Sequence, residues 1–172
     1  MYNKEKIVAI FIDGENLHYT LKALNWKINF RRLLEYFRSS KEYIIYNAFF
    51  YTSRANSEAR KNFLNSLIFK GYTVRQKEIK QIKNRDGEII DQKCNVDIEI
   101  VIEMFDTIPH YDIAILFSGD SDFVEAVKRL RAKGKRIICV SEKGYASKEL
   151  VNEVDNFIRL SDLKEHIEEL PK

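Results

Sequence analysis

Acidic side chains gather at the ends of two short apolar runs in this sequence. Asp13 follows the run at residues 6–12, and Asp120 and Asp122 follow the run at residues 112–117. If the two runs are neighbouring strands, these carboxylates meet at one edge of a sheet, and Asp97 can close the remaining side. Carboxylates within ~4–6 Å of one another cannot all stay ionised near neutral pH without a compensating charge. Oxygen ligands without Cys or His suit Mg²⁺ or Mn²⁺, so the pattern predicts a site for a divalent metal ion.

Helix capping is a simpler explanation for each of these residues taken alone. Asp, Asn and Ser are preferred N-cap residues, and a carboxylate there gains about 0.3–1 kcal/mol from the helix dipole. Asp122 with Glu125 fits a capping box, and Asn16 and Asn95 fit caps as well. A helix needs only one cap, however, whereas the Ser-Gly-Asp-Ser-Asp segment at 118–122 offers two carboxylates and two hydroxyls. Capping therefore does not explain the whole set.

The segments that must position these side chains alternate between strands and helices. Nearly uninterrupted apolar runs are typical of strands buried on both faces of a parallel sheet, and they occur at residues 6–12, 43–51, 112–117 and 136–140. A shorter strand at 73–76 leads into a polar hairpin with its tip at 84–87. A last strand at 156–160 precedes a helix that we expect Ser161 to cap.

Helical periodicity appears between the strands, and each helix has a predicted apolar face. These faces are Ala59, Phe63, Leu67 and Phe69 within 56–70, Ile98, Val101, Ile102 and Phe105 within 96–108, and Phe123, Val127, Leu130 and Arg131 within 123–133. The alternation predicts an α/β sandwich around a mostly parallel sheet. In such sheets ligands bind outside the carboxyl ends of the strands, where the strand order reverses.

The composition is that of a folded protein without a membrane helix. The 172 residues are 45% apolar and 32% charged, which fits one domain, expected to span residues 1–172. The 29 Lys and Arg exceed the 26 Asp and Glu by three, which is compatible with nucleic acid binding without indicating it. No apolar run approaches ~18 residues, no signal peptide is recognisable, and two cysteines cannot form a disulfide framework. We therefore expect a cytoplasmic protein.

Several other chemistries lack their sequence motifs. The sequence has no phosphate-binding loop of the form G-x-x-x-x-G-K-[ST], no G-x-G-x-x-G after the first run and no G-x-S-x-G. The three histidines are scattered without metal-ligand spacing. Phosphatases of the haloacid dehalogenase type normally have a second Asp two positions after the first, where this chain has Glu15.

The motifs resemble those of NYN domains in the LabA-like branch of the PIN-like nucleases. The matching elements are I-F-I-D-G-E-N at 10–16, V-D at 96–97 and F-S-G-D-S-D-F at 117–123. The segment R-I-I-C-V at 136–140 and the residues after it also follow the family order. The resemblance spans residues 6 to 165, and S-G-D-S-D-F is specific when it is paired with D-G-E-N.

This resemblance implies a three-layer α/β/α sandwich with a Rossmann-like PIN fold and metal-dependent hydrolysis of RNA with Mg²⁺ or Mn²⁺. By resemblance, the catalytic and metal-binding carboxylates are Asp13, Asp97, Asp120 and Asp122, and the supporting polar residues are Asn16 and Ser118. The family commonly has Lys-Gly before Val-Asp, whereas this chain has Cys94-Asn95. The adjacent Lys93 is expected to replace that lysine. Glu103 lies about 240° around a helix from Asp97, so we expect it outside the shared pocket.

An acidic pocket repels phosphate, so RNA must be held by basic residues around it. The favoured set lies in and before the hairpin and comprises Arg75, Lys77, Lys80, Lys83 and Arg85. Contacts of this kind would be independent of RNA sequence and sensitive to salt. A second basic segment spans 128–136, and Tyr145 could stack on a base. Charge runs are more often solvated faces, and that simpler reading applies to both segments.

Two other function classes fit the same residues. The domain could bind RNA or a nucleotide as a regulator without cutting it, or it could hydrolyse small phosphoesters. Retention of all four carboxylates favours catalysis, because binding alone needs fewer. Single-stranded or structured RNA is the expected partner, and the sequence is compatible with a homo-oligomer.

Overall fold

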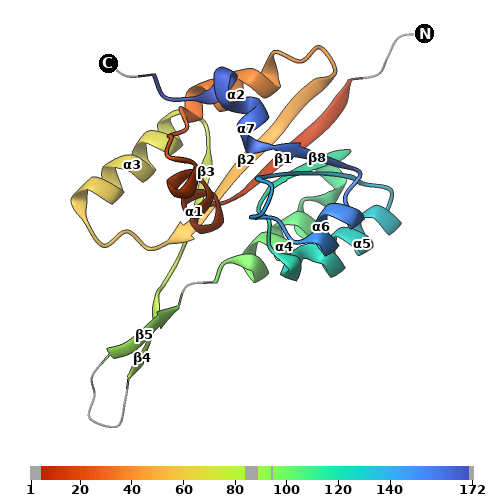
Figure 1. Ribbon diagram of the computed structural model, residues 1–172. Coiled ribbons are helices and arrows are strands. Elements are labelled where there is room, and N and C mark those ends of the chain that lie inside the picture. The colour runs from red at the N-terminus through yellow and green to blue at the C-terminus, as the bar shows by residue number, and fades with distance from the viewer. Residues whose placement is uncertain (1–4, 84–88, 94, 171–172) are drawn as a thin grey trace.

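The apolar runs assemble into one six-stranded parallel sheet in the computed structural model, which describes residues 5–83, 89–93 and 95–170 (Figure 1). The strand order is β3-β2-β1-β6-β7-β8. The strands are β1 (Lys6–Asp13), β2 (Tyr43–Ser53), β3 (Thr73–Lys77), β6 (Ile113–Phe117), β7 (Arg136–Ser141) and β8 (Asn156–Arg159). Every neighbouring pair in this sheet is parallel. The predicted α/β class with a parallel central sheet is confirmed.

The central strands β1 and β6 are neighbours, as the convergence of the acidic segments requires. The chain builds outward from β1 to β2 and β3, then returns to β6 and continues through β7 to β8. The strand order therefore reverses between β1 and β6, and in open α/β sheets ligands bind at the carboxyl side of such a reversal. Asp13 ends β1, and Ser118 comes directly after β6.

Helices cover both faces of the sheet, because alternate strand residues point to opposite sides. One core contains Val8, Ile10 and Ile12 of β1 together with residues of four helices. These helices are α1 (Gly14–Leu24), α2 (Phe30–Arg38), α3 (Glu58–Phe69) and α7 (Leu160–Ile167). The opposite core contains Ala9 and Phe11 with residues of α4 (Asp97–Asp106), α5 (Val124–Ala132) and α6 (Lys148–Glu153), which Figure 1 shows grouped together. The three-layer sandwich is thus confirmed.

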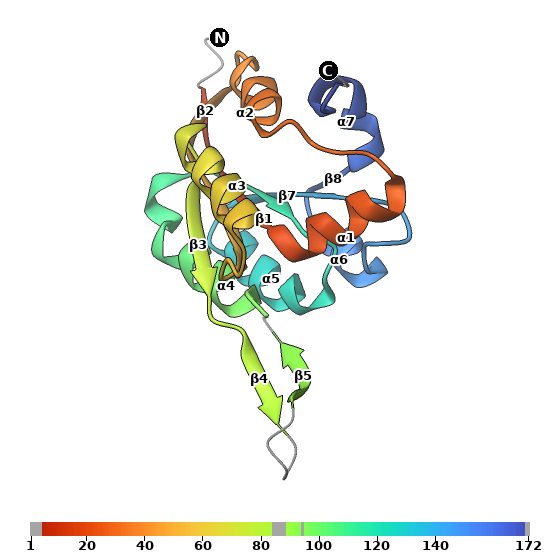
Figure 2. The same cartoon turned by 90° about the vertical axis from the view of Figure 1, so that its left-hand side faces the viewer.

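A two-stranded antiparallel arm extends away from this body (Figure 2). It consists of β4 (Lys80–Lys83) and β5 (Ile89–Lys93), and Lys80 is paired with Lys93 at its base. The arm corresponds to the predicted hairpin, whose tip at 84–87 lies outside the described residues. Two short 3₁₀ turns, Ile108–His110 and Ser121–Phe123, complete the described elements.

The predicted faces of two helices were partly wrong, although Leu67 is buried and Val101 and Phe105 pack against the core as predicted. In α3, Leu64 and Leu67 are buried, whereas the predicted Phe69 is 86% exposed. In α4, Ile100 and Met104 are buried, whereas the predicted Ile98 and Ile102 are more than half exposed. Apolar residues surround α4 on several sides, so periodicity could not select the buried one.

The remaining differences concern helix starts and one helix missed by the sequence analysis. Helix α2 was not predicted, although Asn29 caps it with bonds from the Arg31 and Arg32 N–H groups. Ser161 does not cap α7 but lies in its first turn. The Ser161 N–H and hydroxyl instead donate to the carboxylate of Glu142, which follows β7. A carboxylate from a neighbouring loop therefore replaces the local cap.

Candidate metal centre

Three carboxylates converge beside the carboxyl end of β6. Asp97, Asp120 and Asp122 each offer an oxygen, and these oxygens all lie within 4.8 Å of one another. Asp97 is the first residue of α4, whereas Asp120 and Asp122 belong to the segment that follows β6. The predicted approach of sequence-distant acidic segments is therefore found for these three residues.

The loop after β6 holds its two aspartates through local hydrogen bonds. The Asp120 N–H donates to the Ser118 hydroxyl at 3.3 Å, and the Asp122 N–H donates to the Asp120 carboxylate at 2.9 Å. Asp120 thus caps the 3₁₀ turn, and α5 has no side-chain cap, so the predicted Asp122–Glu125 capping box was wrong. Gly119 is required here, because a Cβ would lie 2.1 Å from the Tyr145 carbonyl oxygen.

Asp13 lies next to the cluster and is almost fully buried, with 5% of its surface exposed. One carboxylate oxygen accepts from the Asn16 N–H at 3.0 Å, so Asp13 caps α1. Its other oxygen accepts from the Ser118 hydroxyl at 3.4 Å. Asn16 was predicted to cap a helix, but it does not cap α1. Its side-chain oxygen instead accepts from the Gly119 N–H at 3.2 Å. Asn16 and Ser118 therefore join the loops that follow β1 and β6.

The electrostatics of the site disfavour the charged forms of Asp13 and Asp97. Burial raises the pKa of Asp13 to about 6 against the opposing hydrogen bond from Asn16, and the charge of Asp97 raises it further. Burial also raises the pKa of Asp97, and the charges of Asp120 and Asp122 act in the same direction. The cations on α3 and β3 pair with other carboxylates: Arg60 with Glu15, Arg75 with Glu103 and Lys77 with Glu99. A cluster of carboxylates that offers only oxygen ligands fits a hard divalent cation.

Two of the predicted RNA contacts, Arg75 and Lys77, lie on β3 and contact acidic residues of α4. The Arg75 guanidinium binds both oxygens of Glu103, at 2.8 and 2.9 Å. The Lys77 ammonium lies 2.7 Å from Glu99 and 2.6 Å from the Asn95 carbonyl oxygen. These contacts hold the start of α4, and with it Asp97, against the sheet. The side chains of the other predicted basic residues, Lys80, Lys83, Arg85 and Lys93, lie outside the described part of the structure.

Glu103 faces away from the aspartate cluster, as its helical offset from Asp97 predicts. Besides binding Arg75, its carboxylate accepts from the Tyr51 hydroxyl at 3.3 Å. The Arg75 hydrogen bonds lower the pKa of Glu103 against the effect of burial. Glu103 therefore has its own cation and does not share the site.

Sequence reasoning missed the role of Glu15, which connects the start of α1 to β2 and α3. Its carboxylate accepts from the Thr52 hydroxyl at 2.9 Å and the Ser53 hydroxyl at 3.0 Å, and it lies 3.1 Å from the Arg60 guanidinium. Gly14 is equally constrained, because a Cβ there would lie 2.6 Å from the Tyr51 carbonyl oxygen. The signal available in the sequence was the motif D-G-E at 13–15. Each of its three residues has a separate structural role at the start of α1.

Two arginines of the second basic segment form ion pairs with nearby acidic residues, and Tyr145 lies in an exposed loop. Arg131 pairs with Asp155 at 3.1 Å and Arg129 pairs with Glu125 at 3.3 Å. Tyr145 is 47% exposed, and its loop contacts the turn at Gly119 through the Ser147 N–H, which donates to the Gly119 carbonyl oxygen. Within the described residues, no helix is both long and apolar enough to cross a membrane.

Comparison with known proteins gives concordant results. The family model of the NYN domain matches residues 7–162. The chain is 41% identical over 162 residues to "Low amplitude and bright protein LabA" of Synechococcus elongatus, covering 94% of this chain and 87% of that protein. A crystal structure of a protein of unknown function from Vibrio parahaemolyticus superposes with a TM-score of 0.78 at 23% identity. That match covers 97% of this chain and 99% of the other and supports the fold.

Proposed function

The chain belongs to the NYN domain family, and from this we propose that it is a metal-dependent endoribonuclease. NYN domains are generally nucleases, which makes nucleic acid the expected substrate class. RNA is the substrate and Mg²⁺ or Mn²⁺ the cofactor in this proposal. The catalytic and metal-binding residues are Asp13, Asp97, Asp120 and Asp122, with Asn16, Ser118 and Lys93 in support.

The observation that carries the proposal is the convergence of carboxylates at the reversal of strand order. The oxygens of Asp97, Asp120 and Asp122 lie within 4.8 Å of one another, and the buried Asp13 adjoins them. A divalent ion bound there would make water more acidic and offset the charge that develops on phosphate oxygens. Structural carboxylates of comparable burial normally have a hydrogen-bonded cation or several donors, and this cluster has few.

Each residue has a distinct part in this proposal. Asp120 keeps one oxygen engaged by the Asp122 N–H, which fixes its orientation. Ser118 and Asn16 orient Asp13 from two sides, through the 3.4 Å hydroxyl contact and the 3.0 Å backbone bond. Asp97 arrives from α4, which Arg75 and Lys77 hold in place. The carboxylates exclude a second anion, so the phosphodiester must approach together with the cation.

RNA binding in this proposal relies on the basic residues around the cluster. Lys80, Lys83 and Arg85 of the arm would neutralise phosphates, while Arg75 and Lys77 would add charge from β3.

We also propose that residues 1–172 act as one domain in the cytoplasm. Cys139, the buried cysteine of the described residues, is a free thiol whose pKa burial raises to about 12, which makes it unreactive.

The decisive experiment compares the parent protein with Asp120→Asn on labelled single- and double-stranded RNA. We expect cleavage with Mg²⁺ or Mn²⁺, none with EDTA, and a loss of at least about a hundredfold in the variant, because the metal supplies several kcal/mol of charge stabilisation. Asp106→Asn is the matched control, because Asp106 is an exposed aspartate at the far end of α4. Equal cleavage by Asp120→Asn would refute the assignment.

The same experiment separates the other function classes. RNA binding without cleavage in either metal would identify a regulatory binding domain. Hydrolysis of p-nitrophenyl phosphate without cleavage of RNA would identify a small-phosphoester hydrolase. Titration of binding against salt would then count the phosphate contacts, since each one adds to the salt dependence.

A further inference from the structure

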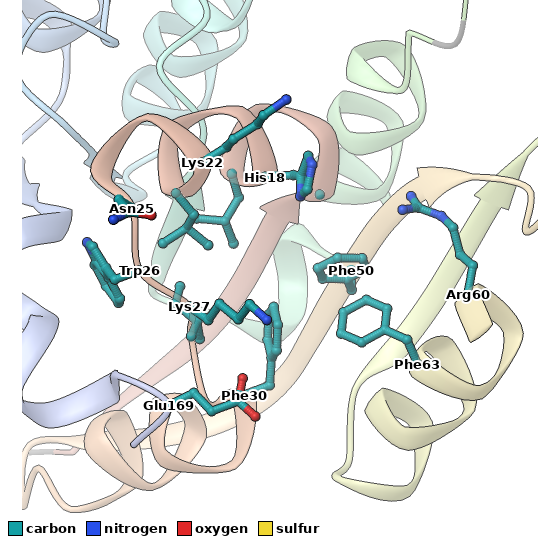
Figure 3. A pocket seen from close by; sticks show the side chains of 14 residues that line it. His18, Lys22, Asn25, Trp26, Lys27, Phe30, Phe50, Arg60, Phe63 and Glu169 are labelled. Atoms are coloured by element: carbon teal, nitrogen blue, oxygen red, sulfur yellow. The ribbon is translucent and has the colours of Figure 1, made fainter. Parts of the chain in front are cut away.

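A second hollow, separate from the aspartate cluster, lies between α1, α3 and the segment at 25–30 (Figure 3). Its volume is about 570 Å³, which is within the ~300–1,000 Å³ typical of small-molecule sites. None of the four aspartates lines it, although Gly14, the neighbour of Asp13 in the chain, does. The hollow therefore needs an explanation other than RNA cleavage.

The inner wall of this cavity is apolar and rigid. Its aromatic side chains are Trp26, Phe30, Phe50 and Phe63, and Leu17 and Leu21 of α1 complete it. Trp26 is 8% and Phe50 4% exposed, so both are fixed by the core behind them. Phe30 contacts Phe50 and Phe63 edge-on, with ring centroids 5.6 and 5.8 Å apart. A wall of this kind accepts an apolar or aromatic body with little rearrangement.

The rim of the cavity is mainly basic. Lys22, Lys27 and Arg60 lie around it, and Glu169 is its acidic member. Arg60 is engaged by Glu15, whereas neither Lys22 nor Lys27 forms an ion pair with a described residue. Figure 3 shows the Lys27 side chain extending across the cavity toward Phe30. The cation best placed to meet a bound ligand is therefore Lys27.

We propose that this cavity binds an amphipathic anion, with its apolar or aromatic body against Trp26 and Phe50 and its acidic group beside Lys27. The acidic group is a carboxylate, phosphate or sulfonate. Charge complementarity supports this class, because Lys27, which forms no ion pair with a described residue, borders a largely apolar wall. Glu169 opposes the same ligand, since its carboxylate stands on the same rim. Removing the charge of Lys27 should therefore weaken binding of the anion, whereas removing the charge of Glu169 should strengthen it.

The test uses two fluorescent probes of similar shape on the full-length protein. Anilinonaphthalene sulfonate carries the negative charge, and N-phenylnaphthylamine is neutral. We expect both to bind saturably at one site per chain, with the anion bound more tightly. Lys27→Gln should weaken the sulfonate about threefold, and Glu169→Gln should strengthen it about twofold, as exposed charge contacts do. Neither change should alter binding of the neutral probe.

Controls separate this site from non-specific binding. Lys128→Gln removes an exposed lysine from α5, on the opposite layer, and should change neither probe. Phe63→Ala should weaken both probes, because it removes part of the shared apolar wall, and circular dichroism verifies the fold. The proposal would be overturned if neither Lys27→Gln nor Glu169→Gln changed the affinity for the sulfonate. It would also be overturned if binding of the sulfonate did not saturate. None of these readouts depends on RNA cleavage.

Competition identifies the source of the anion. Displacement of the sulfonate by dodecanoate, and not by dodecanol, would identify an aliphatic carboxylate. Displacement by adenosine monophosphate, and not by adenosine, would identify a nucleotide. Either result supports an anion site, and displacement by neither anion would overturn it.

Discussion

The molecule contains two groups of carboxylates that differ in how the protein treats their charge. Glu15, Glu103 and Glu142 each connect one part of the fold to another and accept hydrogen bonds from several donors. Burial opposes the charge of Glu15, but bonds from Ser53 and Thr52 and the charge of Arg60 outweigh it, so its pKa is lowered. Burial likewise opposes the charge of Glu142, and bonds from Ser161 lower the pKa. Asp13 and Asp97 of the candidate metal centre have raised pKa values instead.

This difference separates carboxylates that stabilise the fold from carboxylates that a bound cation would stabilise. The glutamates connect neighbouring elements and are neutralised from within the chain. The charges of Asp97, Asp120 and Asp122 oppose one another, and Asp13 is buried beside Asp97. Burying charge without compensation destabilises a protein, and a bound cation removes that cost. The two groups should therefore respond in opposite ways to metal, to pH and to substitution.

Metal addition gives the largest expected contrast. Mn²⁺ at about a hundred times its dissociation constant should add about 2.7 kcal/mol to the free energy of unfolding, which raises the Tm by about 5–10 °C for a chain of this size. Asp97→Asn should lose most of this shift, whereas Glu103→Gln on the same helix should keep it. Thermal unfolding with Mn²⁺ and with EDTA measures both. If Mn²⁺ leaves the Tm of the parent protein unchanged, the proposed metal centre is wrong.

The pH dependence of the metal-free protein gives a smaller contrast. Because the pKa of Asp13 rises from 3.8 to about 6 on folding, the folded state binds more protons between these values. Stability is therefore lost as pH rises through 6, and unfolding in EDTA should cost about 1 kcal/mol more at pH 5 than at pH 7. Asp13→Asn should flatten this dependence and stabilise the metal-free protein at pH 7. Denaturant titrations at both pH values measure it.

The glutamates have the opposite sign in the same titration. Their lowered pKa values contribute stability above the ordinary value of 4.5, and this stability is lost as pH falls through the folded values. Below about pH 4.5 we therefore expect the stability of both parent and Asp13→Asn to decline. A parent protein that is more stable at pH 7 than at pH 5 in EDTA would show that Asp13 is charged without a cation.

The smallest expected effect comes from Glu15. Glu15→Gln keeps an oxygen that can accept from Thr52 and Ser53 but removes the charge that faces Arg60. We expect a loss of about 0.5–1 kcal/mol in the free energy of unfolding and no change in the Tm shift produced by Mn²⁺. Urea unfolding with and without the metal measures both quantities. A lost metal response would place Glu15 with the aspartates and erase the distinction.

The sequence predicted the strands of this fold better than its helices. Buried parallel strands have a nearly continuous apolar signal, and the motifs D-G-E-N and S-G-D-S-D lie where two such strands stop. The buried side of α4 was unpredictable, because apolar residues point in several directions around it. Helix α2 was overlooked although Asn29 and the residues Phe30, Leu33, Leu34 and Phe37 have the spacing of a capped amphipathic helix.

The site was predictable in its residue types and only partly in its connections. Asp120 and Asp122 share one segment with Ser118, so the strand pattern alone placed them together. The hydrogen bond between Asn16 and Gly119 could not be predicted from local sequence, because this bond forms only when β1 and β6 are neighbours. The partnership of Glu15 with Arg60 is hidden for the same reason, since 45 positions separate them. Catalytic, metal and RNA-binding assignments stay predictions until the experiments above are done.

Lys77 gives the molecule a modular construction. Its ammonium group bridges to the Asn95 carbonyl and to Glu99, so the two chain ends of the β4–β5 arm are clasped where they leave the body. Evolution can therefore lengthen, shorten or exchange the arm while the aspartates keep their arrangement. An engineer can graft a foreign hairpin at the same junction.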